Sequence, residues 1–481
     1  MTFVSVLPLV ATVALLASGR AGALQAGLAG LALMALAVAL ALPADAGVAA
    51  FLLRQGAGGA WLAAQIIYVI AGGIFFFLCA QKGDGRPAAD DARDRGTAYR
   101  RLFAACLLLG PFAESAMGFG VGVIVATAAA LRLGARGADA VALALFSQTL
   151  VPWGALAIGT MVGSTLSGLP SALIGSWSAL LSVPLLAGYL VFFWTFAAHA
   201  GFAITPRHRV ADGLWLALAA LALLLSNRNL ATEIALIASL GPVFVLHTLV
   251  HDRPASGTWR AVARRAAPYV ALTVVLIATR TVPLLTAWLG GLLVWKPFAD
   301  QPALLPLYNP GFWLFAIGLA ALVAQANAVA LVRVLHETAG RAWRPAAITL
   351  VFVVMAQWMS ASGIAVTLAT QAYDAFGVAA LAASPLLAAI GGFLTGSNAV
   401  SNGMMMPIQA ALGLHADLPD GFLAGVQNTT GSNFTLLSPM RVAMGCALAG
   451  AAITERDVYA RAWPVGAFVL LVMVLAVAVM L

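Results

Sequence analysis

The amino-acid sequence predicts an all-α polytopic membrane protein, with about twelve transmembrane helices and two re-entrant hairpins in an inverted-topology repeat. Three observations lead to this prediction. Of the 481 residues, 62% are hydrophobic and only 9% are charged, whereas a soluble domain is about one quarter charged. The apolar residues form repeated blocks of about 18–25, the length that crosses a hydrocarbon core of ~30 Å as a helix. Two blocks are interrupted by small and polar residues, and such broken helices are tolerated in a membrane only where they line a cavity.

A transmembrane β-barrel is the other spanning structure, and its strands would alternate apolar and polar residues. The blocks here do not alternate, since residues 31–42 and 465–481 are apolar throughout. The first block lacks the basic leader of a signal peptide and is predicted to be a spanning helix, with a cleaved signal peptide as the alternative. The predicted spans are residues 3–19, 21–42, 60–80, 138–168, 172–198, 211–226, 230–250, 268–290, 311–332, 346–372, 421–450 and 463–481.

Basic residues follow every second predicted span and therefore orient the chain. They gather in residues 82–101, 207–209, 253–265 and 333–344. All of these loops fall on one face of the predicted bundle, which the positive-inside rule makes cytoplasmic, so the N-terminus is expected outside. The net charge of +8 then reflects the orientation of the chain in the membrane. A nucleic-acid partner is not predicted, because it would need a basic face on a soluble domain and the sequence shows no such domain.

The two interrupted blocks, residues 102–131 and 386–414, are predicted to be re-entrant hairpins. Arg132 and Arg136 flank the first, which is expected to open inward, whereas no Lys or Arg occurs between Arg344 and Arg441 around the second. Related sequences recur in both halves: GPFAE is followed by Gln-Thr, and GGFLT by Asn-Thr, at similar spacing. We therefore expect a first repeat at 1–200, linker spans at 201–265 and a second repeat at 266–481, with chance similarity of apolar sequence as the alternative.

Glu114 is the only carboxylate in the first hairpin. An ionisable group at membrane depth is costly to bury and marks a functional site by default. Glu114 is therefore predicted to couple a proton, or a cation such as sodium, to transport. The alternative is a structural glutamate that only accepts hydrogen bonds.

Polar residues concentrate in the second hairpin and in a polar break that follows each hairpin. Hydroxyls, amides and backbone N–H groups freed by an unwound helix can coordinate a small anion near the midplane. The alternative is helix packing through small polar side chains. The predicted substrate-binding residues of this kind are Thr395, Ser397, Asn398, Ser401, Asn402, Gln148, Thr149, Asn428 and Thr429.

Two arginines at membrane depth are candidates for the positive partner of an anion. Arg280 lies within the eighth predicted span, and Arg441 follows Pro439. A guanidinium donates two parallel hydrogen bonds to a carboxylate. For Arg280 the competing interpretation is an interfacial arginine that snorkels to the outer surface.

The remaining signals predict no cofactor and no metal. His247 and His251 have i, i+4 spacing but lack an HExxH pattern. The glycines at 118–122 do not follow a strand, so they are not a dinucleotide fingerprint. Three cysteines show no paired spacing.

Four short motifs resemble the L-lactate permease family: FAESAMGFG at 112–120, FLTGSNAVSN at 393–402, NTTGS at 428–432 and SPM at 438–440. The resemblance implies proton-coupled uptake of lactate and other short 2-hydroxy monocarboxylates such as glycolate. Two positions depart from the family pattern. The family's hairpin Asp is Asn398 here, and a family Lys before the SP element is absent near Thr435 and Leu436. Arg441 is a candidate replacement for that charge, which fits a divergent member.

The sequence therefore predicts a secondary active transporter of a small organic anion in the bacterial plasma membrane, embedded in the lipid bilayer. A dicarboxylate or a sulfonate remains an alternative substrate, and a proton or sodium the coupling ion. A membrane-embedded enzyme would need a nucleophile–base pair or a metal cluster, and neither is found in the sequence. A channel is disfavoured because paired broken hairpins suit alternating access. Assembly into a homo-oligomer is left open.

Overall fold

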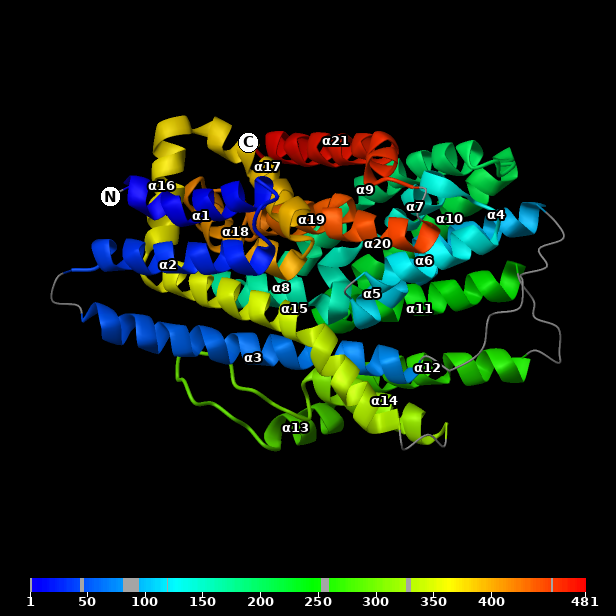
Figure 1. Cartoon of the computed structure of the whole chain (residues 1–481), viewed down its shortest axis with the longest axis horizontal. Coiled ribbons are helices and arrows are strands. Elements are labelled where there is room, and N and C mark those ends of the chain that lie inside the picture. The colour runs from blue at the N-terminus through cyan, green and yellow to red at the C-terminus, as the bar shows by residue number, and fades with distance from the viewer. Residues whose placement is uncertain are drawn as a thin grey trace.

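The computed structural model describes the chain except for residues 1, 44–46, 81–94, 119, 252–258, 326–329 and 451–452. The described residues form a bundle of long, roughly aligned helices (Figure 1). Their only β pairing is an isolated bridge between Trp295 and Leu304. Of the basic loops expected at 82–101 and 253–265, residues 82–94 and 253–258 lie outside the described residues, and the remainder is helical.

The first half of the chain contains α1(Thr2–Ala17), α2(Ala23–Ala41), α3(Val48–Ala80), α4(Arg95–Phe103), η1(Ala104–Leu109), α5(Gly110–Met117), α6(Val121–Arg132), α7(Gly137–Leu145), η2(Phe146–Gln148), η3(Val151–Trp153), α8(Gly154–Ser167) and α9(Ser171–His199). Two helices follow, α10(Pro206–Asn229) and α11(Thr232–His251). The rest contains α12(Trp259–Thr281), α13(Pro283–Gly291), α14(Pro310–Val323), α15(Ala330–Ala361), α16(Ile364–Phe376), α17(Val378–Thr395), α18(Asn398–His415), α19(Phe422–Phe434), η4(Thr435–Leu437), α20(Pro439–Ala449) and α21(Glu455–Met480).

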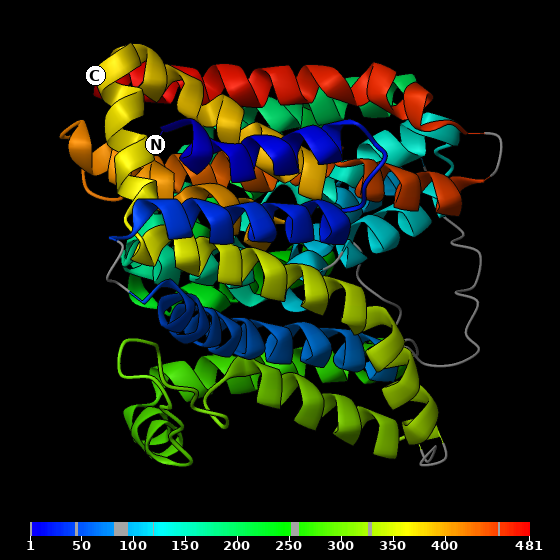
Figure 2. The ribbon, with the colours of Figure 1, turned by 60° about the vertical axis from the view of Figure 1, so that its left-hand side comes forward.

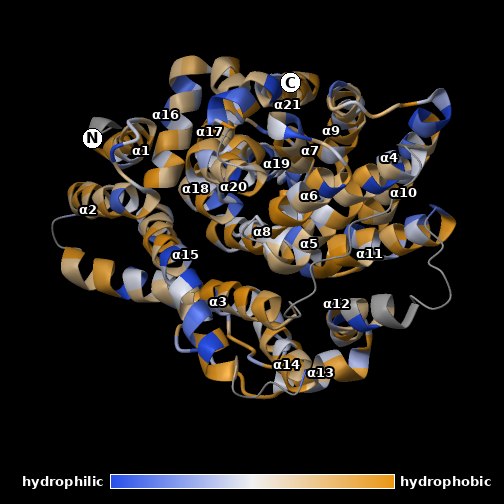
Figure 3. Cartoon of the chain, turned by 45° about the vertical axis from the view of Figure 1, so that its right-hand side comes forward, coloured by the Kyte–Doolittle hydropathy of each residue, from blue (hydrophilic) through white to orange (hydrophobic). Residues whose placement is uncertain are grey.

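The outer surface of the bundle is apolar, as a lipid-facing surface must be. Hydrophobic residues cover most of the outward helical faces (Figure 3), and Leu53, Leu284, Leu414 and Val479 are each at least 75% exposed. A soluble monomer rarely exposes apolar area on this scale. The all-helical polytopic membrane fold predicted from composition is therefore confirmed.

Within the described residues, eight helices are long and apolar enough to cross a membrane, or up to ten if each bent pair is one span. The sequence predicted about twelve. The difference lies in short or polar elements: α1 and α14 are apolar but shorter than the test requires, and the pair α19–α20 is interrupted by η4. The helices α1 and α14 nevertheless pack along α2 and α3 respectively.

The expected span at 346–372 is two helices. The long helix α15 ends at Ala361, and α16 begins at Ile364, because Gly363 adopts a left-handed conformation with φ 77° between them. The expected span at 268–290 is likewise bent by 88° between α12 and α13, where Pro283 begins the new helix.

Both chain termini lie toward the left-hand end of the bundle in Figures 1 and 2, whereas α4, which follows the loop at 81–94, lies at the right-hand end. The connection between α18 and α19 lies at the left-hand end in Figure 2. This arrangement agrees with the orientation drawn from the basic residues, with the right-hand end cytoplasmic.

Both predicted hairpins are broken helix pairs. The first reverses between α5 and α6, and the second between α17 and α18, where Gly396 (φ 63°) and Ser397 separate the helices. The second hairpin begins at Val378, earlier than the predicted 386. The second arm of each hairpin packs against the other half of the chain: α18 packs on α8, and α6 packs on α20. The next helices do the same, since α19 packs on α9 and α7 packs on α21.

Candidate functional site

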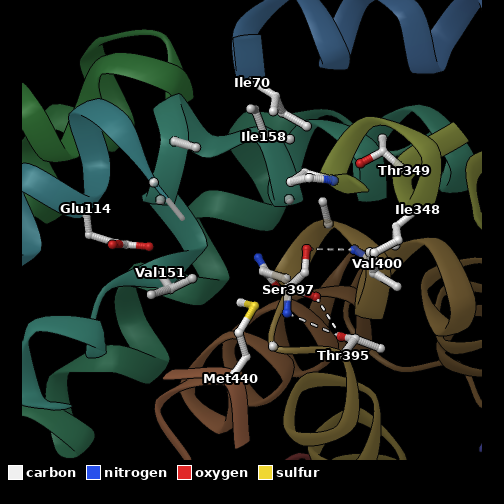
Figure 4. Close-up of a pocket in the computed structure, with 18 of the residues that line it drawn as sticks. Ile70, Glu114, Val151, Ile158, Ile348, Thr349, Thr395, Ser397, Val400 and Met440 are labelled. Carbon is white, nitrogen blue, oxygen red and sulfur yellow. Dashed lines mark hydrogen bonds between the residues drawn. The ribbon is translucent and has the colours of Figure 1, made fainter. Parts of the chain in front are cut away.

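The two hairpin breaks meet the start of α8 at a pocket of about 260 Å³. Its walls come from α5, α8, α18, α20 and the long helices α3 and α15. Figure 4 shows Glu114 on one side and Thr395, Ser397 and Val400 on the other. This volume is many times the ~10–15 Å³ that one water needs, so a small solute with several heavy atoms fits.

The first hairpin is broken by a glycine that no other residue replaces easily. Gly118 has φ 72° and ψ −161°, a conformation that favours glycine. A Cβ at this position would lie 2.5 Å from the Cβ of Ala155. Gly118 therefore allows the hairpin tip to rest directly against the start of α8.

The span that receives this tip is itself discontinuous. The segments on either side of residues 149–150 are bent by 59°, and three consecutive residues, Ala155, Leu156 and Ala157, have φ of 49°, 56° and 57°. Left-handed conformations cost roughly 1–2 kcal/mol per non-glycine residue and persist only where packing enforces them. The polar break predicted at Ser147, Gln148 and Thr149 is a short 3₁₀ turn, and the left-handed turn follows it at residues 155–157, of which Ala155 lines the pocket.

Glu114 projects from α5 toward the N-terminus of α6, which supplies the donors that a carboxylate needs. Its Oε1 accepts from the N–H of Gly120 at 3.2 Å, and its Oε2 accepts from the N–H of Gly122 at 3.1 Å. The positive end of a helix dipole stabilises an anion at such a position. The hairpin therefore holds both side-chain oxygens of Glu114 in place.

Arg441, at the start of α20, is the counter-ion of this carboxylate. Its Nη1 donates to Oε1 of Glu114 at 2.9 Å, and the two side chains are only 4% and 3% exposed. Its Nη2 approaches the carbonyl of Gly396 at 3.5 Å. Its buried Nε has no hydrogen-bond partner among the described residues. Both residues line the pocket, so this ion pair is part of the pocket wall.

The tip of the second hairpin faces the same pocket with polar groups. Ser397 caps α18 by accepting from the N–H of Val400 at 3.4 Å, and Thr395 accepts from the N–H of Ser397 at 3.3 Å. The buried Oδ1 of Asn398 has no partner in the part of the chain that the structure describes. The predicted residues Thr395, Ser397 and Asn398 are therefore brought together with Glu114 and Arg441 in one pocket.

Behind the pocket, Asn428 joins four helices. Its Oδ1 accepts from Asn398 at 2.9 Å and from Asn402 at 2.8 Å. Its Nδ2 donates to Thr160 and Ser178, both at 2.9 Å. Asn402 also donates to the carbonyl of Gly159 at 2.9 Å. Neither Asn402 nor Asn428 lines the pocket, so their contacts hold the hairpin tip against α8, α9 and α19.

The other predicted polar residues are buried outside the pocket lining. Ser401 accepts from Gln427 Nε2 at 3.1 Å, between the hairpin and α19. Gln148 donates to Ser147 at 3.2 Å. The hydroxyls of Thr149 and Thr429 have no partner among the described residues. The structure thus places Ser401, Gln148, Thr149 and Thr429 around the pocket but not in it.

Arg280 lies away from the pocket, in a cage of its own. Its Nη2 donates to the carbonyl of Tyr308 at 2.7 Å, and its Nε lies 3.5 Å from Glu233. The guanidinium also stacks 4.4 Å from the centre of the Tyr308 ring. Its side chain is only 1% exposed, so it is not a snorkelling arginine, and its donors are used within this cage.

The long helices contribute pocket residues that the sequence did not single out. Ile70 comes from α3, Ile348 and Thr349 come from α15, and Ile158 comes from α8. Ile70 and Ile348 resemble lipid-facing residues in sequence, and the packing of α3 against α15 brings them to the site. Among the described residues, no group of three His, Cys, Asp or Glu side chains could hold a metal.

The sequence is similar to one family of known proteins. The model of the L-lactate permease family matches residues 301–481. The L-lactate permease of Salmonella typhimurium is 26% identical over 406 residues, covering 73% of this chain and 72% of that protein. The L-lactate permease of Escherichia coli K12 is 27% identical over the same shares. Among solved structures, the YdaH transporter of Alcanivorax borkumensis aligns with 91% of this chain and 89% of its own, at a TM-score of 0.48 and 14% identity.

Proposed function

We propose that the chain is a divergent member of the L-lactate permease family in the bacterial inner membrane, and that it transports lactate or a related short 2-hydroxy monocarboxylate. The transported anion binds in the pocket where the two hairpin tips meet. The single observation that carries this proposal is the buried guanidinium of Arg441, which belongs to a residue that lines the pocket and has an Nε without a partner among the described residues. A buried polar donor without an acceptor is costly, and a carboxylate supplies the acceptor it lacks.

The lining favours a monocarboxylate over a dicarboxylate or a sulfonate. Arg441 is the only basic residue among the described residues that line the pocket. A second carboxylate would be buried without a counter-ion, which is strongly unfavourable. A sulfonate would present a third oxygen for which this pocket offers no further charged donor.

The 2-hydroxyl and the carbon chain of the substrate have partners of suitable chemistry. Asn398 Oδ1 is a buried acceptor without a donor, and it is the proposed partner of the substrate hydroxyl. The methyl group of lactate packs on the apolar side chains of Ile158 and Val400, which also line the pocket. Glycolate lacks this methyl group and loses roughly one buried carbon of contact, about 0.8 kcal/mol.

Transport follows alternating access in an inverted repeat, with residues 1–200 and 266–481 as the repeated halves. The reciprocal packing of α18 on α8 and of α6 on α20 supports this symmetry. The pocket lies where the broken helices of both halves meet, as in other transporters of inverted topology.

The proposed coupling ion is a proton on Glu114, since the only other titratable group in the described lining is Arg441. Sodium is the alternative coupling ion. The same lining lacks a nucleophile–base pair, which favours a transporter over an enzyme.

The test is uptake of labelled lactate, glycolate, acetate and succinate into proteoliposomes, with and without an inward proton gradient. We expect concentrative uptake of lactate and glycolate, weaker uptake of acetate and none of succinate. Arg441→Gln is expected to weaken lactate binding by at least about 2 kcal/mol, the typical loss for a charged hydrogen-bonded pair. Arg280→Gln is the matched control, because that arginine is equally buried but lies outside the pocket. Equal affinity in both variants would contradict the assignment of Arg441, and uptake of succinate alone would contradict the substrate class.

A further inference from the structure

The carboxylate of Glu114 occupies the position at Arg441 that a substrate carboxylate needs. Nη1 of Arg441 donates to Oε1 of Glu114 at 2.9 Å, and both residues line the pocket. We propose that the transported anion binds by replacing Glu114 as the counter-ion of Arg441, and that this replacement requires Glu114 to be protonated. The inference rests on the proposed function and specifies how anion and proton are coupled.

The net charge of the pocket gives the physical reason. With Glu114 ionised and Arg441 charged, the described lining is neutral. A bound monocarboxylate would bring the total to −1 in a site where both side chains are at most 4% exposed. An uncompensated buried charge is strongly unfavourable, whereas protonation of Glu114 restores neutrality. The anion and the proton therefore enter together or not at all.

The geometry of Glu114 allows it to give up Arg441 without leaving its site. Two backbone N–H groups of the hairpin, those of Gly120 and Gly122, hold its two oxygens independently of the arginine. When protonated, Glu114 keeps its remaining acceptor capacity for these donors and gains an O–H donor. This O–H is directed toward the pocket, where the bound carboxylate is the acceptor.

Arg441 can exchange the carboxylate of Glu114 for that of the substrate while it keeps at least one hydrogen-bond acceptor. Its Nη2 stays near the carbonyl of Gly396 at 3.5 Å. Its Nε, unpartnered among the described residues, lies on the same side of the guanidinium as Nη2, and these two donors form the fork that binds a carboxylate through two parallel hydrogen bonds. The empty carrier pairs Nη1 with Glu114, and the loaded carrier uses the fork of Nε and Nη2 for the substrate.

Among the described residues of the elements packed against α5, no other charged group competes for this exchange. The elements packed against α5 are α3, α6, α8, α11 and the short helices η1 to η3. Arg54 pairs with Asp300 at 3.9 Å, Arg132 donates to its own helix, and Glu233 pairs with Arg280. The titratable groups on these elements that do not line the pocket are Arg54, Tyr68, Cys79, Cys106, Arg132, Glu233, His247 and His251.

Two consequences follow for transport. Each monocarboxylate is accompanied by one proton, so the loaded and the empty carrier have equal charge and transport is electroneutral. The unloaded, unprotonated carrier keeps an internal ion pair, which spares it from moving an isolated charge through the membrane.

The experiment measures lactate binding to the purified full-length protein by calorimetry between about pH 5 and pH 8, in buffers of different ionisation enthalpy. Above pH 5 lactate itself stays ionised, because its carboxyl group titrates near that of a free Asp. We expect uptake of about one proton per lactate, and an affinity that weakens about tenfold per pH unit wherever Glu114 is ionised. Glu114→Gln is expected to bind lactate with no proton uptake and with an affinity that changes less than about twofold over the same range.

The outcomes separate this inference from the proposed function. Lactate binding by the wild type without proton uptake overturns the exchange and leaves the substrate assignment standing. Absence of lactate and glycolate binding at every pH overturns both. If Glu114→Gln does not fold, the proton count of the wild type still decides. The neutral double variant E114Q/R441Q is the matched control, since it removes the ion pair without leaving a charge and is expected to fold but not to bind.

Discussion

Arg441 and Glu114 form a buried ion pair at 2.9 Å that joins two segments 327 positions apart in the sequence. Glu114 belongs to the tip of the first hairpin and Arg441 to the helix after the second polar break. The pair thereby links the two halves of the chain at the pocket. Each single neutralisation leaves an unpaired charge in a site that is nearly closed to solvent.

The first prediction concerns the stability of this pair. Arg441→Gln and Glu114→Gln should each lower the free energy of unfolding, by roughly 3–5 kcal/mol, because each leaves one buried charge uncompensated. The double variant should lose much less than the sum, since it buries no charge. Thermal unfolding in detergent of the wild type, the two single variants and the double variant measures these losses of stability as a double-mutant cycle. Additive losses would mean that the two charges are stabilised separately.

The second prediction concerns the break in the first hairpin. Gly118→Ala places a Cβ 2.5 Å from Ala155 Cβ in a backbone with φ 72°. Gly168→Ala is the matched control, because Gly168 has φ 74° and an added Cβ there meets nothing within 4 Å. Both variants carry the left-handed strain of about 1 kcal/mol, but only Gly118→Ala also displaces the hairpin tip. We expect a lactate-uptake defect in Gly118→Ala alone. Equal uptake in the two variants would show that the tip tolerates the displacement.

The third prediction concerns Asn428, whose four contacts hold the second hairpin. Asn428→Leu should leave the amides of Asn398 and Asn402 without their common acceptor and weaken lactate binding by at least tenfold, about 1.4 kcal/mol. Gln409→Leu serves as a control, because Gln409 bonds only within the hairpin arms, to Ser384. Calorimetric affinities distinguish the two. Stronger loss in the control would place the sensitivity in the arms of the hairpin.

The fourth prediction concerns topology. Cysteines at Arg207 and Asp420, both exposed, should lie on opposite sides of the membrane, with Asp420 outside. The native cysteines are all buried and leave a low background. A membrane-impermeant maleimide should label Asp420→Cys in intact cells and Arg207→Cys only after permeabilisation. Labelling of both cysteines in intact cells would place them on the same side of the membrane and contradict the inverted repeat.

Much of the fold could be predicted from sequence because membranes restrict spanning segments to apolar helices. The hairpin breaks were visible as glycines and polar residues, such as Gly118 and Asn398, inside apolar blocks. The ends of elements were less predictable: the stop between α15 and α16 depends on the single residue Gly363.

The candidate site was predictable as a set of residue types but not as a set of contacts. Glu114 and Arg441 stood out as charges at membrane depth, yet their pairing is a long-range contact that local patterns do not encode. Arg280 looked equally suitable in sequence, and only its contacts with Glu233 and Tyr308 separate it from the pocket. Ile70 and Ile348 could not be told from lipid-facing residues, because their role depends on how α3 and α15 pack.

The most direct test of the central claim is gradient-driven uptake of labelled lactate by the wild type and by Glu114→Gln in proteoliposomes. The wild type should accumulate lactate when a proton gradient is imposed, and an imposed membrane potential alone should not drive accumulation. Glu114→Gln should fail to accumulate lactate under the proton gradient while still exchanging internal for external lactate. Gradient-driven accumulation at the wild-type level in Glu114→Gln would contradict the role of Glu114 as the proton carrier.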